Sequence, residues 1–203
     1  MTRGGAVILQ LPEASTAGPP PGFDPWIFPA WLIAREAIAP IENVESDWPL
    51  VAQEMANNGV WSRESAAGMI GTMGIETAHS FKPVKEAYYL AHLYGWSEAR
   101  VEQWRADNFW YYPYYGRGYI QTTHDYNYAD LSWRVGVDLL ADPDRATESW
   151  IAAVGAASYW ARRNIHTVAA EHNWPEVRRR VLGAAPFDDV AYITRVAEVL
   201  LAA

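Results

Sequence analysis

Glu76 and Glu86 stand ten residues apart in the sequence, and the segment between them contains Pro83. We expect Glu76 to end a helix and the chain to reverse after it, which would bring the two carboxyl groups across a cleft. Hydrolysis of a glycosidic bond uses two such groups. One protonates the leaving oxygen, and in an inverting enzyme the other activates water from ~6.5–9.5 Å away. Many proteins have glutamates at this spacing, so the pair alone does not establish the chemistry.

The helix predicted before Glu76 places apolar side chains beside this glutamate. Met69, Thr72 and Met73 precede it by seven, four and three residues, and these spacings share one helix face. Partial removal from water would favour the neutral acid and raise the pKa of Glu76, as a general acid requires. An isolated glutamate at a helix end more often points into solvent, so the role depends on the second carboxyl.

The segment YYPYYGRGYIQTTHDYNY (residues 111–128) combines aromatic rings with hydroxyl and amide groups. Sugars present apolar C–H faces as well as hydroxyl groups, so a sugar site needs flat rings and hydrogen-bonding side chains together. The segment therefore fits one wall of a glycan-binding groove. The side chains that supply both kinds of contact are Tyr111, Tyr112, Tyr114, Tyr115, Gln121, Thr123 and Asn127.

The composition excludes several classes of function. A net charge of −8 over 203 residues argues against non-specific nucleic-acid binding and against attachment to anionic membranes. The absence of cysteine excludes disulfides, thiol nucleophiles and cysteine-ligated zinc. The five histidines show neither an HExxH motif nor a pair four residues apart, so we expect no metal ion and no other cofactor. The 11 tryptophans and 12 tyrosines fit either a ring-rich core or a sugar-stacking groove.

The pattern after the Pro/Gly-rich stretch 15–25 is helical almost throughout, which predicts one mainly α domain. Asp47, Ser62 and Ser97 are the expected N-caps of three of its helices. Weak strand signals occur around 116–122 and after Phe81. Trp150, Tyr159 and Trp160 follow the apolar stripe of the longest helix and are expected in the core. The predicted helices are 25–39, 47–58, 62–76, 97–107, 142–164, 174–182 and 188–202.

The segments ETAHSFKPVKEAYY (76–89) and YYGRGYIQTTHDYNY (114–128) resemble glycoside hydrolase family 19 of the lysozyme-like superfamily, and its phage endolysin branch most of all. The resemblance covers roughly residues 48–183, and Gly-Arg-Gly-x-Ile-Gln followed by Asn-Tyr is its most specific phrase. It implies a mainly α, lysozyme-like, two-lobed helical domain with a central cleft and at most a small β element. Residues 1–22 would form an N-terminal arm and linker, and residues 23–203 the catalytic domain.

The resemblance assigns roles to individual residues. Glu76 matches the general acid, and Glu86 matches the second carboxylate of the endolysin branch. Plant chitinases of the family place their base further along the chain, where Glu98 is the nearest candidate, so this choice stays open. Thr123 matches the hydroxyl residue that helps to hold the attacking water. Gln121, Tyr126 and Asn127 match the family's substrate-contacting positions. Together with residues chosen for their side-chain chemistry, the expected substrate contacts are Tyr111, Tyr115, Arg117, Gln121, Tyr126, Asn127 and Arg179.

One position departs from the family pattern. The family commonly has Val-Asn-Gly near the end of the domain, with its Asn lining the cleft, whereas this chain has Leu182 there. We therefore expect an altered substrate contact on that side. Arg179 could reach the cleft from the same helix, although basic residues late in a helix more often serve as solvated dipole partners.

The resemblance implies an inverting hydrolase of β-1,4 bonds between N-acetylated amino sugars, with bacterial peptidoglycan as the expected substrate and cell-wall lysis as the result. A chitinase and a non-catalytic wall-binding virion component are the alternatives. The apolar run 6–11 is too short for a secretory signal, and no segment has the ~20 apolar residues of a membrane span. We expect a monomer that stays in the host cytoplasm until its release to the wall.

Overall fold

The computed structural model describes residues 41–202. The predicted arm and linker at 1–22 and the helix expected at 25–39 lie outside the described residues. Helices account for most of the described part, and one two-stranded antiparallel sheet accompanies them. The prediction of a mainly α fold with at most a small β element is confirmed.

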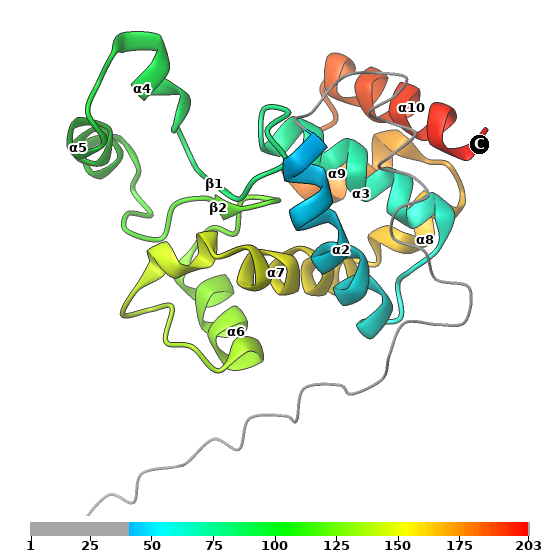
Figure 1. Ribbon diagram of the computed structural model, residues 1–203, viewed down its shortest axis with the longest axis horizontal. Coiled ribbons are helices and arrows are strands. Elements are labelled where there is room, and N and C mark those ends of the chain that lie inside the picture. Colours follow the sequence, from blue (N-terminus) through cyan, green and yellow to red (C-terminus); the bar gives the residue numbers. More distant parts are fainter. Residues whose placement is uncertain (1–40, 203) are drawn as a thin grey trace, which may run out of the picture.

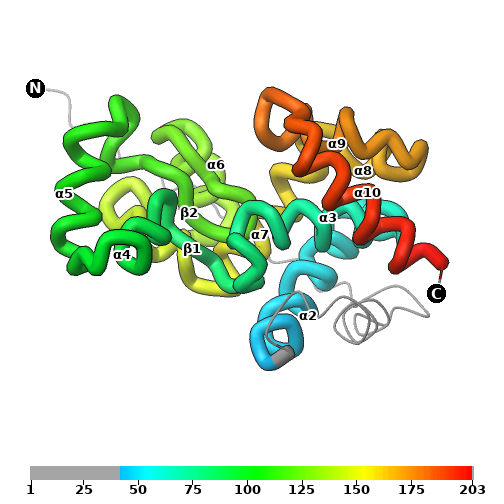
Figure 2. The backbone as a smooth tube through the Cα atoms, turned by 90° about the horizontal axis from the view of Figure 1, so that it is seen from above, coloured from blue at the N-terminus to red at the C-terminus, as the bar shows by residue number. Residues whose placement is uncertain are grey.

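The helices form two lobes joined by one long helix (Figures 1 and 2). The joining helix is α7 (Ser149–Arg162), which follows the 3-10 turn η1 (Pro143–Thr147) and contacts elements of both lobes. The smaller lobe contains β1 (Val84–Lys85), α4 (Tyr89–Tyr94), α5 (Glu98–Asn108), β2 (Arg117–Gly118) and α6 (Asp125–Val135). The larger lobe contains α2 (Ile41–Asn57), α3 (Arg63–Glu76), α8 (Ile165–Ala170), α9 (Trp174–Leu182) and α10 (Phe187–Leu201).

Helix α3 is buried around its whole circumference in the larger lobe, because every residue from Ser65 to Gly74 is buried. Small residues allow its neighbours to come close. A Cβ atom at Gly71 would lie 3.1 Å from the Cα of Ile193 in α10, so the two helices pack almost backbone to backbone. Met69 and Met73 are fully buried on this helix. The helix that carries Glu76 is thus fixed by packing up to its last turn.

Two of the three predicted N-caps are confirmed, and one is wrong. The side chains of Ser62 and Ser97 accept backbone N–H groups at the starts of α3 and α5, at 3.0 and 3.4 Å, as expected. The prediction for Asp47 is wrong, because α2 begins at Ile41 and includes Pro49. The register of α2 turns Asp47 into the protein, where it is almost completely buried.

Other expectations about the elements need correction. The single helix predicted at 142–164 is divided into η1 and α7, because the intervening Glu148 has an extended backbone. The short helices α4, α6 and α8 were not predicted. Of the three rings expected in the core, Trp160 is fully buried, Tyr159 is half-buried, and Trp150 is 44% exposed.

Asp47 joins α2 to two later parts of the chain. Its carboxylate accepts hydrogen bonds from the Tyr119 hydroxyl and the Lys82 ammonium, and from Ser46 at 2.6 Å. Burial alone would raise the pKa of Asp47, but hydrogen bonds from Lys82, Ser149, Ser46 and Tyr119 together hold it below its ordinary value of 3.8. Tyr119 directly follows β2, so this carboxylate helps to anchor the sheet to the larger lobe.

Among residues 41–202, no helix has both the length and the apolar character that a bilayer crossing would require.

We predict that Asp47→Asn lowers the free energy of unfolding by about 1–3 kcal/mol at neutral pH, because the buried Tyr119 hydroxyl and the half-buried Lys82 ammonium lose a charged acceptor. The lowered pKa of Asp47 adds stability above pH 3.8, and this stability is lost as the pH falls below that value. The difference in the free energy of unfolding between wild type and variant should therefore be smaller at low pH. Urea denaturation at about pH 7 and about pH 3.5 measures both effects. Asp107→Asn, at an exposed position of α5, is the control and should change stability by less than ~0.5 kcal/mol. A gap of equal size at both pH values would contradict the account.

Candidate active site

A cleft of about 630 Å³ is lined by residues of both lobes and of α7. Its walls come from the end of α3, the segments beside the two-stranded sheet, α6, α7 and α9. The cleft brings together most of the residues predicted from the sequence. Those that line it are Glu76, Glu86, Tyr111, Gln121, Thr123, Tyr126, Asn127 and Leu182.

Glu76 is the last residue of α3, and its side chain lines the cleft and is only 12% exposed. Its carboxylate forms an ion pair with Arg178 of α9, whose Nε also donates to Asp189 of α10 at 2.8 Å. Arg178 is itself buried, so one guanidinium links the end of α3, the middle of α9 and the start of α10 around the carboxylate. The expectation for Glu76 needs correction, because its surroundings are not only apolar: the charged Arg178 also faces the glutamate.

The turn after Glu76 is held by Thr77. Its hydroxyl donates to the carbonyl of Met73 at 2.7 Å and accepts the N–H of Phe81 at 3.0 Å. The carbonyl of Thr77 accepts the hydroxyl of Tyr88, which lies beyond β1, at 3.1 Å. These bonds reverse the chain after α3 and lead it directly into the strand before Glu86.

Glu86 follows β1 and is held by the antiparallel partner strand. Its N–H donates to the carbonyl of Gly116 at 2.7 Å, and the N–H of Gly116 donates to its Oε2 at 2.8 Å. A Cβ atom at Gly116 would lie 3.1 Å from this oxygen and 2.7 Å from Gln121 Oε1, so a larger residue there would displace the side chains of Glu86 and Gln121. Arg105 Nε donates to the Glu86 carbonyl at 2.8 Å, and Tyr111 donates to Oε1 at 3.0 Å. Both carboxylate oxygens are thus oriented and still have lone pairs free.

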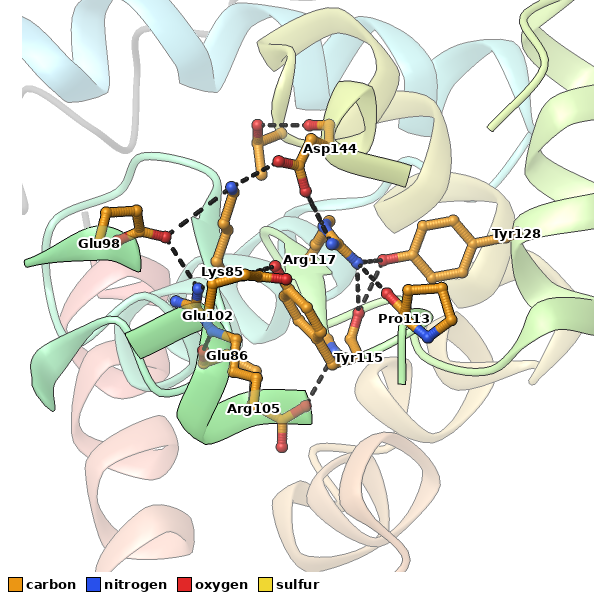
Figure 3. A network of polar contacts seen from close by, with 12 residues as sticks. Lys85, Glu86, Glu98, Glu102, Arg105, Pro113, Tyr115, Arg117, Tyr128 and Asp144 are labelled. Carbon is orange, nitrogen blue, oxygen red and sulfur yellow. Dashed lines mark hydrogen bonds and ion pairs between the residues drawn. The ribbon is translucent and has the colours of Figure 1, made fainter. Parts of the chain in front are cut away.

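Glu98 has a different environment from Glu86. Its side chain is 59% exposed, it pairs with Arg105 at 2.8 Å and with Lys85 at 3.9 Å, and it does not line the cleft. Figure 3 shows Glu98 on the opposite side of Lys85 from Asp144, within a network of charged side chains. Between the two candidates left open by the sequence, the geometry favours Glu86.

Thr123 and its neighbours form the polar wall of the cleft. The Thr123 hydroxyl donates to the carbonyl of Gln121 at 2.8 Å, which leaves its lone pairs available to accept from a water molecule. The amide of Asn127 donates to the carbonyl of Thr123 at 2.8 Å. Tyr111, His124 and Tyr126 form a chain of ring contacts along the cleft, each pair with centroids 5.4 Å apart. The wall therefore offers both flat rings and polar groups, as the sequence predicted.

Three of the seven expected substrate contacts do not line the cleft, and neither do Tyr112 and Tyr114 of the ring-rich segment. Tyr115 is buried, and its hydroxyl donates to Glu102 at 2.8 Å. Arg117 is buried against the Tyr115 ring and pairs with Asp144 at 2.7 Å, as Figure 3 shows. Arg179 is exposed and pairs with Glu176 of its own helix. We correct these predictions. Tyr115 and Arg117 are buried structural residues that hold the sheet in place, and Arg179 is a surface residue.

Arg178, the partner of Glu76, was not predicted as a site residue. A usable signal was present in the sequence, because Arg178 lies four residues after Trp174, which starts the buried stripe of α9. Arg162 and Arg163, which line the cleft at the end of α7, were not predicted as site residues either. No group of three or more metal-binding side chains is found within residues 41–202.

Tyr111 offers a direct test of this geometry. Burial and the nearby Glu86 carboxylate raise the pKa of Tyr111 from 10 to about 12. The protonated phenol therefore stabilises the fold fully below pH 10, and this contribution is lost as the pH rises through about 12. We predict that the phenolate absorbance that distinguishes wild type from Tyr111→Phe is still mostly absent at about pH 11. Half-titration of this difference near pH 10 would contradict the contact with Glu86.

Known proteins of one family are similar to this chain. A family model described as chitinase class I, glycoside hydrolase family 19, matches residues 65–181. Endochitinase 2 of Solanum tuberosum is 48% identical over 48 residues, and an endochitinase of Arabidopsis thaliana is 36% identical over 66 residues. These alignments cover 23% and 32% of this chain, but only 15% and 24% of the two plant proteins.

The fold is similar to that of chitinase C from Streptomyces griseus HUT6037. The crystal structure of that enzyme gives a TM-score of 0.52 at 19% identity and covers 87% of this chain and 76% of that one. A mutant of chitinase C gives the same TM-score and identity and covers 91% of its own chain. At this identity the likeness establishes the helical, lysozyme-like fold. The family match spans more than half of the sequence, and the chain therefore belongs to glycoside hydrolase family 19, the chitinase class I family.

Proposed function

We propose that this chain hydrolyses β-1,4 bonds between N-acetylated amino sugars with inversion, and that peptidoglycan is its polymer. The observation that carries the proposal is the position of Glu76 and Glu86, which come from different lobes and line one cleft. The same cleft presents the rings and amides that a sugar strand would contact. Two carboxyl groups across a sugar-binding cleft are the minimum equipment of a glycosidase.

In this proposal Glu76 is the general acid. Its proton passes to the glycosidic oxygen as the bond from that oxygen to the anomeric carbon breaks. Arg178 is a positioning residue, because its fork holds the Glu76 carboxyl at a fixed angle while Asp189 holds the other side of the guanidinium. The packing of α3 limits movement of the backbone behind it.

Glu86 is the proposed general base. It takes one proton from a water molecule whose oxygen forms the new bond to the anomeric carbon, on the face opposite the leaving group. Tyr111 and Gly116 orient its two oxygens, and Thr123 offers an acceptor for the other O–H of the water. Atoms and charge balance: Glu76 loses one proton, Glu86 gains one, and the bond is cleaved by one water.

Chitin is the second candidate substrate, because the curated relatives are endochitinases by name. Peptidoglycan remains our proposal through the resemblance of residues 76–89 and 114–128 to phage endolysins, which would act on the wall after release from the host cytoplasm. A non-catalytic wall-binding role is the remaining alternative. The presence of both carboxyl groups in one cleft speaks for turnover rather than binding alone.

We predict that Glu76→Gln and Glu86→Gln each lower hydrolysis roughly 100- to 10,000-fold with retained folding. Glu98→Gln is the matched control and should stay within about threefold, because its exposed side chain lies outside the cleft. Reducing-end release from purified cell walls and from colloidal chitin measures the rates and separates the two polymers. NMR of the first product should show the α-anomer. A β-anomer, or full activity of Glu76→Gln, would reject the assignment.

We predict that Arg178→Lys lowers kcat roughly 100-fold with little change in KM, because lysine keeps the charge but cannot bridge Glu76 and Asp189 as a planar fork. Arg179→Lys, one residue further on the same helix, is the control and should keep wild-type kinetics. Equal losses in the two variants would indicate that general charge on α9, rather than positioning of Glu76, is what matters.

A further inference from the structure

Two arginines border the cleft at the end of α7, and no role in the proposed reaction uses them. Arg162 and Arg163 both line the cleft and are both exposed. We call them the arginine rim. The whole chain has a net charge of −8, so two adjacent exposed cations at its main cleft run against the average charge of the molecule.

The rim is poorly neutralised. Arg162 lies 3.6 Å from Asp130, but that carboxylate is already held by Arg134 through contacts of 2.9 and 3.3 Å. Arg163 has no ion-pair partner within residues 41–202. The neighbouring helix α9 adds no excess of negative charge, since its single acid near the rim, Glu176, is shared by two arginines. The rim therefore keeps its positive charge toward the cleft.

The rim is also held in place. The guanidinium carbons of Arg162 and Arg163 lie 5.9 and 5.3 Å from the ring centroid of Tyr159, which also lines the cleft. The Tyr159 hydroxyl donates to the carbonyls of Arg180 and Val181 at 3.1 and 3.3 Å. Arg180 in turn donates to the carbonyl of Arg163 at 3.1 Å. Two guanidiniums on a fixed ring form a partly preorganised anion site rather than two free side chains.

We propose that the arginine rim is a subsite for the carboxylate carried by muramic acid, on its peptide stem or on its bare lactyl group. This inference rests on the proposed glycosidase function of the same cleft. Guanidinium groups bind carboxylates through paired N–H donors, and an exposed pair of arginines suits a substituent that projects from a sugar strand. Chitin carries no acidic group, so the rim adds nothing to the affinity for chitin. The rim thus gives a physical basis for preference between the two candidate polymers.

The test measures binding without turnover, in a Glu76→Gln background, by titration calorimetry. The three probes are a peptidoglycan tetrasaccharide with stems, the same strand with its stems removed by an amidase, and the chitin tetrasaccharide. They present a stem carboxylate, a lactyl carboxylate and no carboxylate. The rim variant is Arg162→Gln/Arg163→Gln. The control is Arg100→Gln, which removes an exposed guanidinium 4.4 Å from the Trp96 ring and away from the cleft lining.

We expect the rim variant to bind at least one of the two acidic strands about five- to tenfold more weakly than the parent. Its affinity for the chitin tetrasaccharide should stay within twofold, and the loss should shrink at high salt. The strand that loses affinity identifies which carboxylate is bound. Unchanged affinity for both acidic strands, or an equal loss for chitin, would overturn the subsite.

The outcome is separable from that of the proposed function. Hydrolysis of peptidoglycan by the wild type, with no effect of the rim variant on binding, would leave the function standing and remove the subsite. A carboxylate-selective effect of the rim, in a chain that hydrolyses only chitin, would keep the subsite and reject peptidoglycan as the polymer cut.

Discussion

The burial of α3 is the constraint on which the rest of the molecule depends. This helix is enclosed by the other helices of the larger lobe and approaches α10 through Gly71 with almost no space between backbones. A helix packed on all sides cannot rotate or slide without opening the core. Its last residue, Glu76, therefore leaves the core at one fixed point, and Arg178 completes the placement from α9. The acid of the proposed reaction is positioned by the fold itself.

The position of the second carboxyl group, that of Glu86, depends on the short two-stranded sheet. Two residues of β1 pair with two residues of β2, and the reciprocal hydrogen bonds of Glu86 and Gly116 extend this pairing by one step. Such a short sheet has little stability alone. Two arginines stabilise it. Arg117 of β2 pairs with Asp144, and Arg105 donates a hydrogen bond to the carbonyl of Glu86. Figure 3 shows Arg105 and Arg117 within one network of polar contacts that also contains Glu86 and Asp144. Charged side chains thus hold Glu86 in position, whereas apolar packing of α3 holds Glu76 in position.

The sequence predicted well wherever one local rule decided the outcome. Ser62 and Ser97 cap helices because a hydroxyl before a helical pattern has one good partner, the N–H three residues on. Asp47 failed the same rule because a longer helix buried it, and only the later residues Lys82 and Tyr119 reveal why. The motif around Gly116 located the cleft wall correctly, yet Arg117 within it points away from the cleft. Motif membership gives position along the chain, whereas side-chain direction depends on contacts made far along the sequence.

The central claim is that Glu76 and Glu86 act on one sugar strand from opposite faces. The most direct measurement is a crystal structure of the Glu76→Gln chain with a bound chitin tetrasaccharide. The account predicts a glycosidic oxygen within hydrogen-bonding distance of residue 76, and a water molecule between Glu86, Thr123 and the anomeric carbon on the opposite face. A sugar strand bound with both carboxyl positions on the same face, or bound outside the cleft, would contradict it.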